Sequence, residues 1–316
     1  MHDTFVNALF YADDGAFISH TVHEMQQMMD ALRVYCSRWR MFVNTSKTKV
    51  MVFNQKKAVN VKPIFTYDGV ELEIVSEFKY LGVLFSIHNA HGNNRYSASI
   101  EHRLKQAKRL VATWMRRCEI WNFKPDVVIN QFNTCIMPAL DYGVGLWGVG
   151  LYKSDSWKKV EVFWRYIARC ILGVSQRAPN GGVYGDLGWY PFEVRAAWQA
   201  TSMWSRITEL PNTSLTRKAM YVQRDLCSKG KQCWLKSLKS TLLSKTLCGH
   251  DMWSKWWRTC DFNIICSRSS IDDRGIHSVV RWETDCLESL RTHACDEWYK
   301  DVTRVTYYSK AWYWTE

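Results

Sequence analysis

The residue pattern of the 316-residue chain changes near residue 96. Before that point, short runs of β-formers alternate with turn dipeptides, of which Asp14-Gly15 and Asp68-Gly69 are the clearest hairpin signals. After it, apolar residues recur every three or four positions, and Trp39 alone of the 17 tryptophans precedes residue 100. This order predicts an α+β fold in which a sheet-containing part is followed by a mostly helical part.

The sequence pattern of residues 1–96 predicts short strands around one amphipathic helix. Thr21 and Glu24 have the spacing of a capping box, and apolar residues then recur at helical spacing as far as Trp39. Runs of β-formers on either side of this helix predict strands, at 6–12, 16–19, 49–53 and 78–86 with a hairpin within 63–75. The polar stretch 89–94 is typical of a loop and ends this part.

Residues 97–177 predict a basic helical part. Thirteen Lys/Arg oppose six Asp/Glu there, so this part carries +7 of the net charge of +12. Further helices are expected at 126–140, kinked at Pro138, and at 157–172, and residues 178–316 predict a helical C-terminal region. The first helix has an apolar stripe formed by Ile100, Leu104, Ala107, Val111, Trp114 and Cys118. Its remaining surface carries Arg103, Lys105, Lys108, Arg109, Arg116 and Arg117.

A basic helical face has two interpretations. Lys and Arg on one face neutralise phosphates without reading base sequence, which favours a nucleic-acid partner. The alternative is a solvated charged face, which is the commoner case for a single helix. The concentration of positive charge in 97–177 favours nucleic acid over the alternative.

The composition argues against several other classes of protein. With 47% hydrophobic residues, the chain can build cores and does not resemble a disordered tail. No run approaches the ~18 apolar residues of a membrane span, so no membrane partner is expected. The 11 cysteines are scattered and lack the paired spacing of zinc sites, so we expect core or incidental thiols in a reduced, intracellular protein.

Asp13 and Asp14 lie in the apolar, aromatic stretch NALFYADDGAFIS. Together with a third carboxylate, adjacent aspartates at a hairpin turn can hold the two divalent cations that clamp a phosphoryl displacement. The alternative is that both are turn formers, because Asp-Gly turns are common. On spacing alone the turn is the more frequent case.

The segments around this stretch resemble, in order, those of a reverse transcriptase of the non-LTR (LINE-type, jockey-like) retrotransposons. FYADD is similar to the catalytic hairpin, and MQQMMDALRVYCSRWRMFVNTSKTKVMVFN to the palm helix with its Asn-x-x-Lys-Thr-Lys strand. FKYLGVLFS resembles the hairpin that grips the primer, and ASIEHRLKQAKRLVATWMRR the first thumb helix. MPALDYGVGLW and RYIARCILGVSQRAPNGGVYGDLGWYP resemble segments further downstream, so the resemblance covers about residues 5–210.

The resemblance implies an RNA-directed DNA polymerase that extends a DNA primer on an RNA template with Mg²⁺ or Mn²⁺. Asp13 and Asp14 would be the catalytic, metal-binding pair, with Asp14 nearer the primer terminus and Tyr11 beside the template–primer duplex. Either Lys47 or Lys49 would lie near the incoming triphosphate, although a solvated strand end is an equal alternative. The primer-grip hairpin would comprise Phe78, Lys79, Tyr80, Leu81 and Gly82, unless they form an ordinary core strand.

The resemblance also implies parts that we do not find before Tyr11. A third metal-binding aspartate and the fingers would precede the catalytic hairpin, and Asp3 is too close to supply a separate strand. We therefore expect a C-terminal fragment with a partial palm (1–96), a thumb (97–177) and a C-terminal region (178–316), inactive alone and nuclear if it follows its family. The alternatives are a non-catalytic nucleic-acid-binding remnant and a functionless translated fragment. Arg40, where the family usually has glycine, departs from the pattern at the helix exit.

Overall fold

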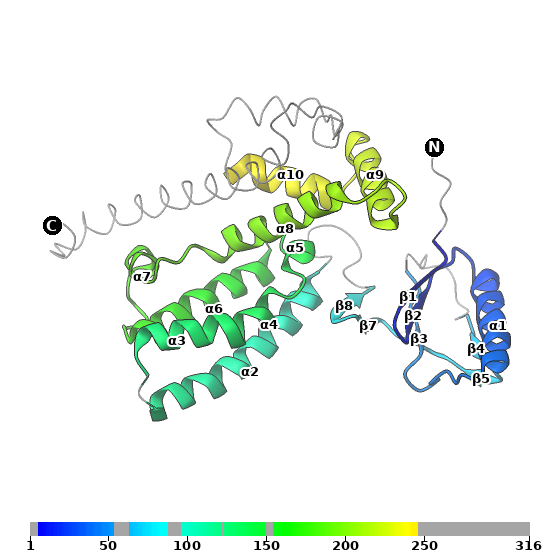
Figure 1. Cartoon of the computed structure of the whole chain (residues 1–316), viewed down its shortest axis with the longest axis horizontal. Coiled ribbons are helices and arrows are strands. Elements are labelled where there is room, and N and C mark those ends of the chain that lie inside the picture. Colours follow the sequence, from blue (N-terminus) through cyan, green and yellow to red (C-terminus); the bar gives the residue numbers. More distant parts are fainter. Residues whose placement is uncertain (1–5, 54–62, 88–95, 122, 150–153, 246–316) are drawn as a thin grey trace. The chain divides into compact units, whose positions relative to one another are not determined.

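A computed structural model describes residues 6–53, 63–87, 96–121, 123–149 and 154–245 (Figure 1). The chain divides into two compact units, Met1–Ala98 and Ser99–Glu316, and each is treated by itself. The boundary lies next to the change in residue pattern near residue 96. A further division at residue 177 stays a prediction, and residues 246–316 of the expected C-terminal region lie outside the described residues.

The first unit is built from one helix and short paired strands. Three antiparallel pairs, β1–β2, β4–β5 and β7–β8, and one parallel pair, β3–β6, each form a separate two-stranded sheet. The elements are β1 Ala8–Tyr11, β2 Asp14–Phe17, α1 Val22–Trp39, β3 Lys49–Val50, β4 Thr66–Tyr67, β5 Val70–Glu71, β6 Glu73–Ile74, β7 Glu77–Tyr80 and β8 Val83–Ser86.

Helix α1 begins and ends where local chemistry requires. The Thr21 hydroxyl accepts the Glu24 backbone N–H at 3.1 Å, and the Glu24 carboxylate accepts the Thr21 N–H at 3.3 Å, which confirms the predicted capping box. The helix ends at Arg40, whose left-handed backbone (φ 54°, ψ 37°) is the conformation that glycine favours at this position. Arg40, which stands where the family usually has glycine, therefore has a strained backbone.

The core of the first unit joins α1 to the middle strands. Met29 packs with the buried residues of the following segments, Val50, Phe65, Tyr67 and Leu72. The Gln26 side-chain amide bonds both backbone groups of Thr66, at 2.9 and 3.0 Å, and so fixes α1 against β4. Helix α1, β3 and β4 therefore share one core.

Two of the expected strands differ from the structure. The strand expected at 49–53 is limited to Lys49–Val50, where it pairs with β6. The run 78–86, read as one strand from its β-formers, is the hairpin β7–β8, because Leu81 and Gly82 both have positive φ (45° and 79°) and reverse the chain. The hairpin that the resemblance implies for this run is therefore the form that the structure adopts.

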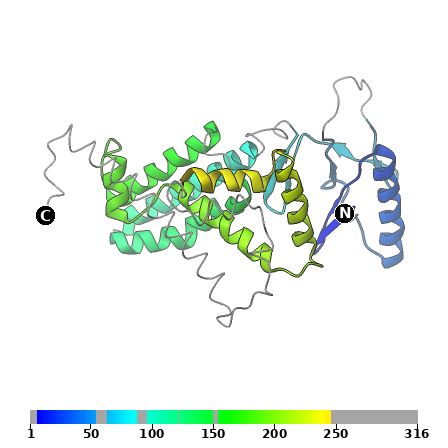
Figure 2. The ribbon, with the colours of Figure 1, turned by 90° about the horizontal axis from the view of Figure 1, so that it is seen from above.

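The second unit is helical throughout its described residues (Figures 1 and 2). The expected kink at Pro138 is a π-helical turn, η2, that lies just before the proline and widens the helix between α3 and α4. The elements are α2 Ser97–Trp121, α3 Pro125–Gln131, η2 Phe132–Ile136, α4 Met137–Asp141, α5 Val144–Trp147, α6 Asp155–Leu172, α7 Asn180–Leu187, α8 Phe192–Glu209, α9 Leu215–Ser228 and α10 Trp234–Lys245.

Aromatic side chains fill the centre of this unit. The Phe132 ring is completely buried and lies 5.2–5.9 Å from the rings of Trp114, Trp164 and Trp189. The Trp164 indole also donates its N–H to the Tyr190 carbonyl at 2.9 Å, so that its polar atom is satisfied inside the core. Trp114, Trp164 and Trp189 thus take part in helix packing within the described part of this unit.

Candidate functional site

The β1–β2 hairpin places both aspartates at its tip. Tyr11 pairs with Asp14, so the turn consists of Ala12 and Asp13, and Ala12 adopts a left-handed φ of 53°. The predicted turn at Asp14-Gly15 is therefore wrong: Asp14 begins β2 and Gly15 lies within it. Gly15 is opposite Phe10, and a Cβ there would approach the Phe10 ring to 3.1 Å, so glycine makes room for that ring.

The tip of this hairpin is open to solvent. Asp13 and Asp14 are exposed, and the Tyr11 side chain is 67% exposed. Phe10 and Leu9 on β1 are also exposed, whereas Phe17 of β2 packs against the core of the unit. The exposure makes the two carboxylates available to a ligand.

The donor set of the tip is insufficient for a two-metal centre. Asp13 and Asp14 supply two carboxylates, and the described residues contain no group of three or more His, Cys, Asp or Glu side chains that could hold a metal ion. Such a centre needs further protein donors to hold two cations beside the reacting phosphate. The described residues therefore do not complete the implied Mg²⁺ or Mn²⁺ site.

The two candidate lysines lie in different environments. Asn44 closes the turn before β3: its backbone carbonyl accepts the N–H of Lys47 and Thr48, and its side-chain oxygen accepts the Ser46 hydroxyl. Lys47 is exposed at this turn. The Lys49 ammonium instead pairs with the Glu73 carboxylate of β6 at 2.6 Å, which ties β3 to β6. The geometry leaves Lys47 the more accessible of the two cations.

The β7–β8 hairpin presents the residues expected to grip a primer. Phe78 and Tyr80 are partly buried, while Lys79 is exposed. Leu81 at the turn is 36% exposed despite its left-handed backbone, and Gly82 follows it. Because β1–β2 and β7–β8 form separate sheets, the described residues do not join the two hairpins into one palm sheet.

Helix α2 has the two faces that its sequence predicts. All six residues of the expected stripe, from Ile100 to Cys118, are buried. Lys105, Arg109 and Arg116 lie opposite this stripe and are exposed, at spacings of four and seven residues that align them along the helix. Lys108 and Arg117 are exposed on its flanks.

Arg103 differs from the other basic residues of α2. Its guanidinium lies 4.3 Å from the centroid of the Tyr142 ring and donates to the Gln106 side-chain oxygen at 3.3 Å. Burial lowers the pKa of this guanidinium, and the Tyr142 hydroxyl opposes that effect. Arg103 therefore helps to pack α2 onto the segment before α5, whereas the exposed residues form the basic face of α2.

A carboxylate that the sequence did not single out lies between α6 and α8. Glu161 accepts the backbone N–H of Glu193, in the first turn of α8, at 3.0 Å. Burial raises the pKa of the Glu161 carboxyl to about 7; the Glu193 charge adds to the rise, and the N–H groups of α8 oppose it. Its position three residues before Trp164, on the edge of the α6 apolar stripe, is the only signal in the sequence.

The chain is similar to transposon proteins. It is 23% identical over 66% of its length to a probable RNA-directed DNA polymerase from transposon BS of Drosophila melanogaster, of which the match covers 23%. It is 25% identical over 53% of its length to a putative uncharacterized transposon-derived protein of Caenorhabditis elegans, of which the match covers 57%. It thus spans about a quarter of the first relative and somewhat over half of the second. No family model and no solved structure matches the chain.

These similarities support the coarser part of the sequence interpretation. The chain is like a transposon-borne RNA-directed DNA polymerase, as its motifs indicated. The mixed helical and sheet content is compatible with the expected α+β fold. Among the described helices, none has the length and apolarity that crossing a membrane requires.

Proposed function

We propose that the chain is part of the reverse transcriptase of a non-LTR, jockey-like retrotransposon, and that it binds an RNA template paired with a DNA primer. The observation that carries this proposal is the exposed pair Asp13 and Asp14, with Tyr11, at the tip of a hairpin in a chain similar to a transposon polymerase. In the proposal, Asp13 and Asp14 would hold metal in a nucleotidyl-transfer centre whose other ligands are not among the described residues. A nuclear location belongs to the same proposal.

The basic face of α2 supplies the contact with nucleic acid. Lys105, Arg109 and Arg116 align on the side of the helix that faces away from the core, where cations can reach successive phosphates. Contacts of this kind are independent of base sequence, which a polymerase needs because it must hold any template–primer duplex. The same contacts release counterions, so the affinity falls as salt concentration rises.

A salt titration tests the binding step. We expect the 316-residue chain to bind a labelled RNA–DNA template–primer with an affinity that falls linearly on a double-logarithmic salt plot. The triple variant Lys105→Gln, Arg109→Gln, Arg116→Gln should reduce the slope by about 2–3, at about 0.7–0.9 for each lost phosphate contact. Lys158→Gln is the matched control, because Lys158 is an exposed cation of the same unit but is paired with Asp155. Absence of binding, or equal slopes for the triple variant and the wild type, would refute the proposal.

Primer extension separates binding from catalysis. With Mg²⁺ or Mn²⁺ and all four nucleotides, we expect no DNA synthesis by the purified chain, because its described residues do not complete a two-metal centre. Asp13→Asn with Asp14→Asn should leave template–primer binding nearly unchanged. Processive synthesis that this double variant abolishes would contradict the expected inactivity and would establish an active polymerase.

A further inference from the structure

A second concentration of positive charge lies outside α2. Residues 210–245, which contain α9 and α10, carry eight Lys/Arg and one acidic residue, a net charge of +7. The 81 residues from 97 to 177 carry the same net charge in more than twice the length. The segments on either side are slightly acidic: residues 178–209 have two Lys/Arg and three Asp/Glu, and residues 246–316 have nine and eleven.

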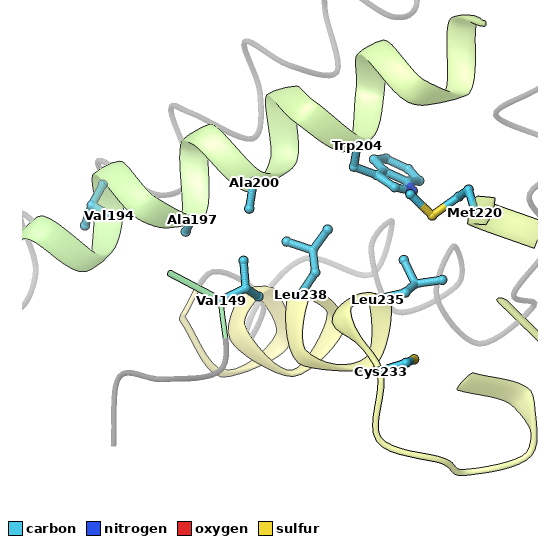
Figure 3. Packing of buried hydrophobic residues seen from close by; sticks show 9 residues of the cluster. All are labelled: Val149, Val194, Ala197, Ala200, Trp204, Met220, Cys233, Leu235 and Leu238. Carbon is cyan, nitrogen blue, oxygen red and sulfur yellow. The ribbon is translucent and has the colours of Figure 1, made fainter. Parts of the chain in front are cut away.

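The apolar sides of α9 and α10 are used in the core. Leu235 and Leu238 of α10, with Met220 of α9, point toward Trp204 and Ala200 of α8 (Figure 3). The rest of this cluster comprises Val149, Val194, Ala197 and Cys233. Gln223 of α9 accepts the backbone N–H of Trp234 at 3.0 Å and so fixes the start of α10 against α9. Because the helices are held on their apolar sides, the exposed residues Lys229 and Lys231 lie on a rigid support, whereas Arg217 of α9 is buried.

Three lysines lie at or beside the turn between the two helices. The Lys236 ammonium donates to the Gly230 carbonyl at 2.7 Å, Lys231 is the next residue along the turn, and Lys229 precedes Gly230. Asp225, which pairs with Lys229 at 2.7 Å, is the single acidic residue of the whole segment. The turn therefore holds two more ammonium groups than carboxylates, and their mutual repulsion favours an anionic ligand.

We propose that the turn between α9 and α10 is a second phosphate-contact surface, at which Lys231 and Lys236 bind the sugar-phosphate backbone of a nucleic acid, next to Lys229, which Asp225 holds in an ion pair. The proposal rests on the proposed function and extends it to a separate surface. The neighbours of the lysines favour phosphates over a membrane: Ser228 and Gln232 are polar and exposed, whereas membrane-surface helices place apolar side chains beside their cations.

The salt dependence of binding also tests this surface. In the full chain, we expect Lys231→Gln with Lys236→Gln to lower the salt slope for the RNA–DNA template–primer by about 1.4–1.8, at about 0.7–0.9 for each contact. Asp225→Asn removes the opposing charge and should instead raise the affinity. Lys158→Gln again serves as the control, and tryptophan fluorescence, to which this unit contributes most residues, verifies that each variant is folded.

The outcomes distinguish this proposal from the proposed function. The first outcome is that the triple variant of α2 lowers the slope of the salt plot, while Lys231→Gln with Lys236→Gln keeps the wild-type slope. In that case the second surface is refuted and the proposed function stands. If the wild-type chain does not bind template–primer at all, the proposed function fails, and this inference fails with it. Vesicles of phosphatidylcholine and phosphatidylserine form a third arm: lysine-dependent vesicle binding with an unchanged nucleic-acid slope would assign the turn to a membrane and overturn the proposal.

Discussion

Glu161 should make the helical unit less stable as the pH rises from acidic to neutral. Its carboxyl is held between α6 and α8, next to Glu193 and within reach of the Arg165 charge on its own helix, and its pKa rises from the ordinary 4.5 to about 7. In the unfolded chain the same carboxyl ionises near its ordinary pKa. Folding therefore takes up a proton between these two values, and the stability linked to that proton is complete below pH 4.5.

The size of the effect follows from linkage. A pKa difference from 4.5 to about 7, at about 1.4 kcal/mol per pH unit, amounts to about 3 kcal/mol. The free energy of unfolding should fall across this window and level off once the pH passes the folded pKa. The sign is the reverse of that for an ion-paired carboxylate, whose stabilising contribution appears as the pH rises.

The substitution Glu161→Gln isolates this contribution. The glutamine carbonyl can still accept the Glu193 N–H, but the side chain no longer ionises. We expect the variant to match the wild type near pH 4 and to exceed its free energy of unfolding by up to about 3 kcal/mol at pH 8. Urea unfolding followed by tryptophan fluorescence measures this difference, because Trp39 is the single tryptophan outside the unit.

Glu209→Gln is the matched control for this experiment. Glu209 is the last residue of α8 and is exposed, so its removal should leave the pH profile of the wild type unchanged. Parallel profiles for Glu161→Gln and the wild type would refute the reasoning, since they would mean that Glu161 takes up no extra proton on folding.

Two backbone positions give further predictions. Arg40→Gly should stabilise α1 by about 0.5–1 kcal/mol, because φ is 54° at this residue and glycine adopts such a φ without a steric penalty. Slower amide hydrogen exchange in Val22–Trp39 would verify this stabilisation, and unchanged or faster exchange would contradict it. Gly145→Ala should destabilise the helical unit by about 1–3 kcal/mol, because its Cβ would lie 2.9 Å from the Gln199 carbonyl oxygen of α8. Gly182→Ala, in open space within α7, is the control and should be neutral or slightly stabilising in the same unfolding assay, whereas equal losses for the two variants would refute the packing argument.

Features that depend on neighbours in the sequence were predictable. The six-residue stripe of α2 and the capping box of α1 involve residues at most four positions apart, so helical geometry alone places them together. The strain at Arg40 was indicated by the glycine that the resemblance implies at the same position. The resemblance likewise implied a hairpin at 78–86, where β-formers alone predicted one strand.

The register of the first hairpin depends on packing across the strands and was not predictable from turn propensity. Asp-Gly is the stronger turn dipeptide, yet the turn forms two residues earlier, at Ala12 and Asp13. This register puts Gly15 opposite Phe10, whose ring lies edge-on to Phe17 with centroids 5.6 Å apart. This register therefore combines the contact between the two rings and the small residue opposite Phe10 with a left-handed Ala12.

The net charge of residues 178–316, taken as a whole, does not reveal the second phosphate-contact surface. A net charge of +4 for residues 178–316 conceals +7 in the helical pair α9–α10, because the flanking segments are acidic. Electrostatic attraction acts over a Debye length of about 10 Å. The net charge that a ligand meets is therefore the sum over residues that lie close together in the fold. The α9–α10 pair, held by Leu235, Leu238 and Met220 on its apolar side, is such a group, and its charge should therefore act on a polyanion independently of the more acidic segments that surround it in the sequence.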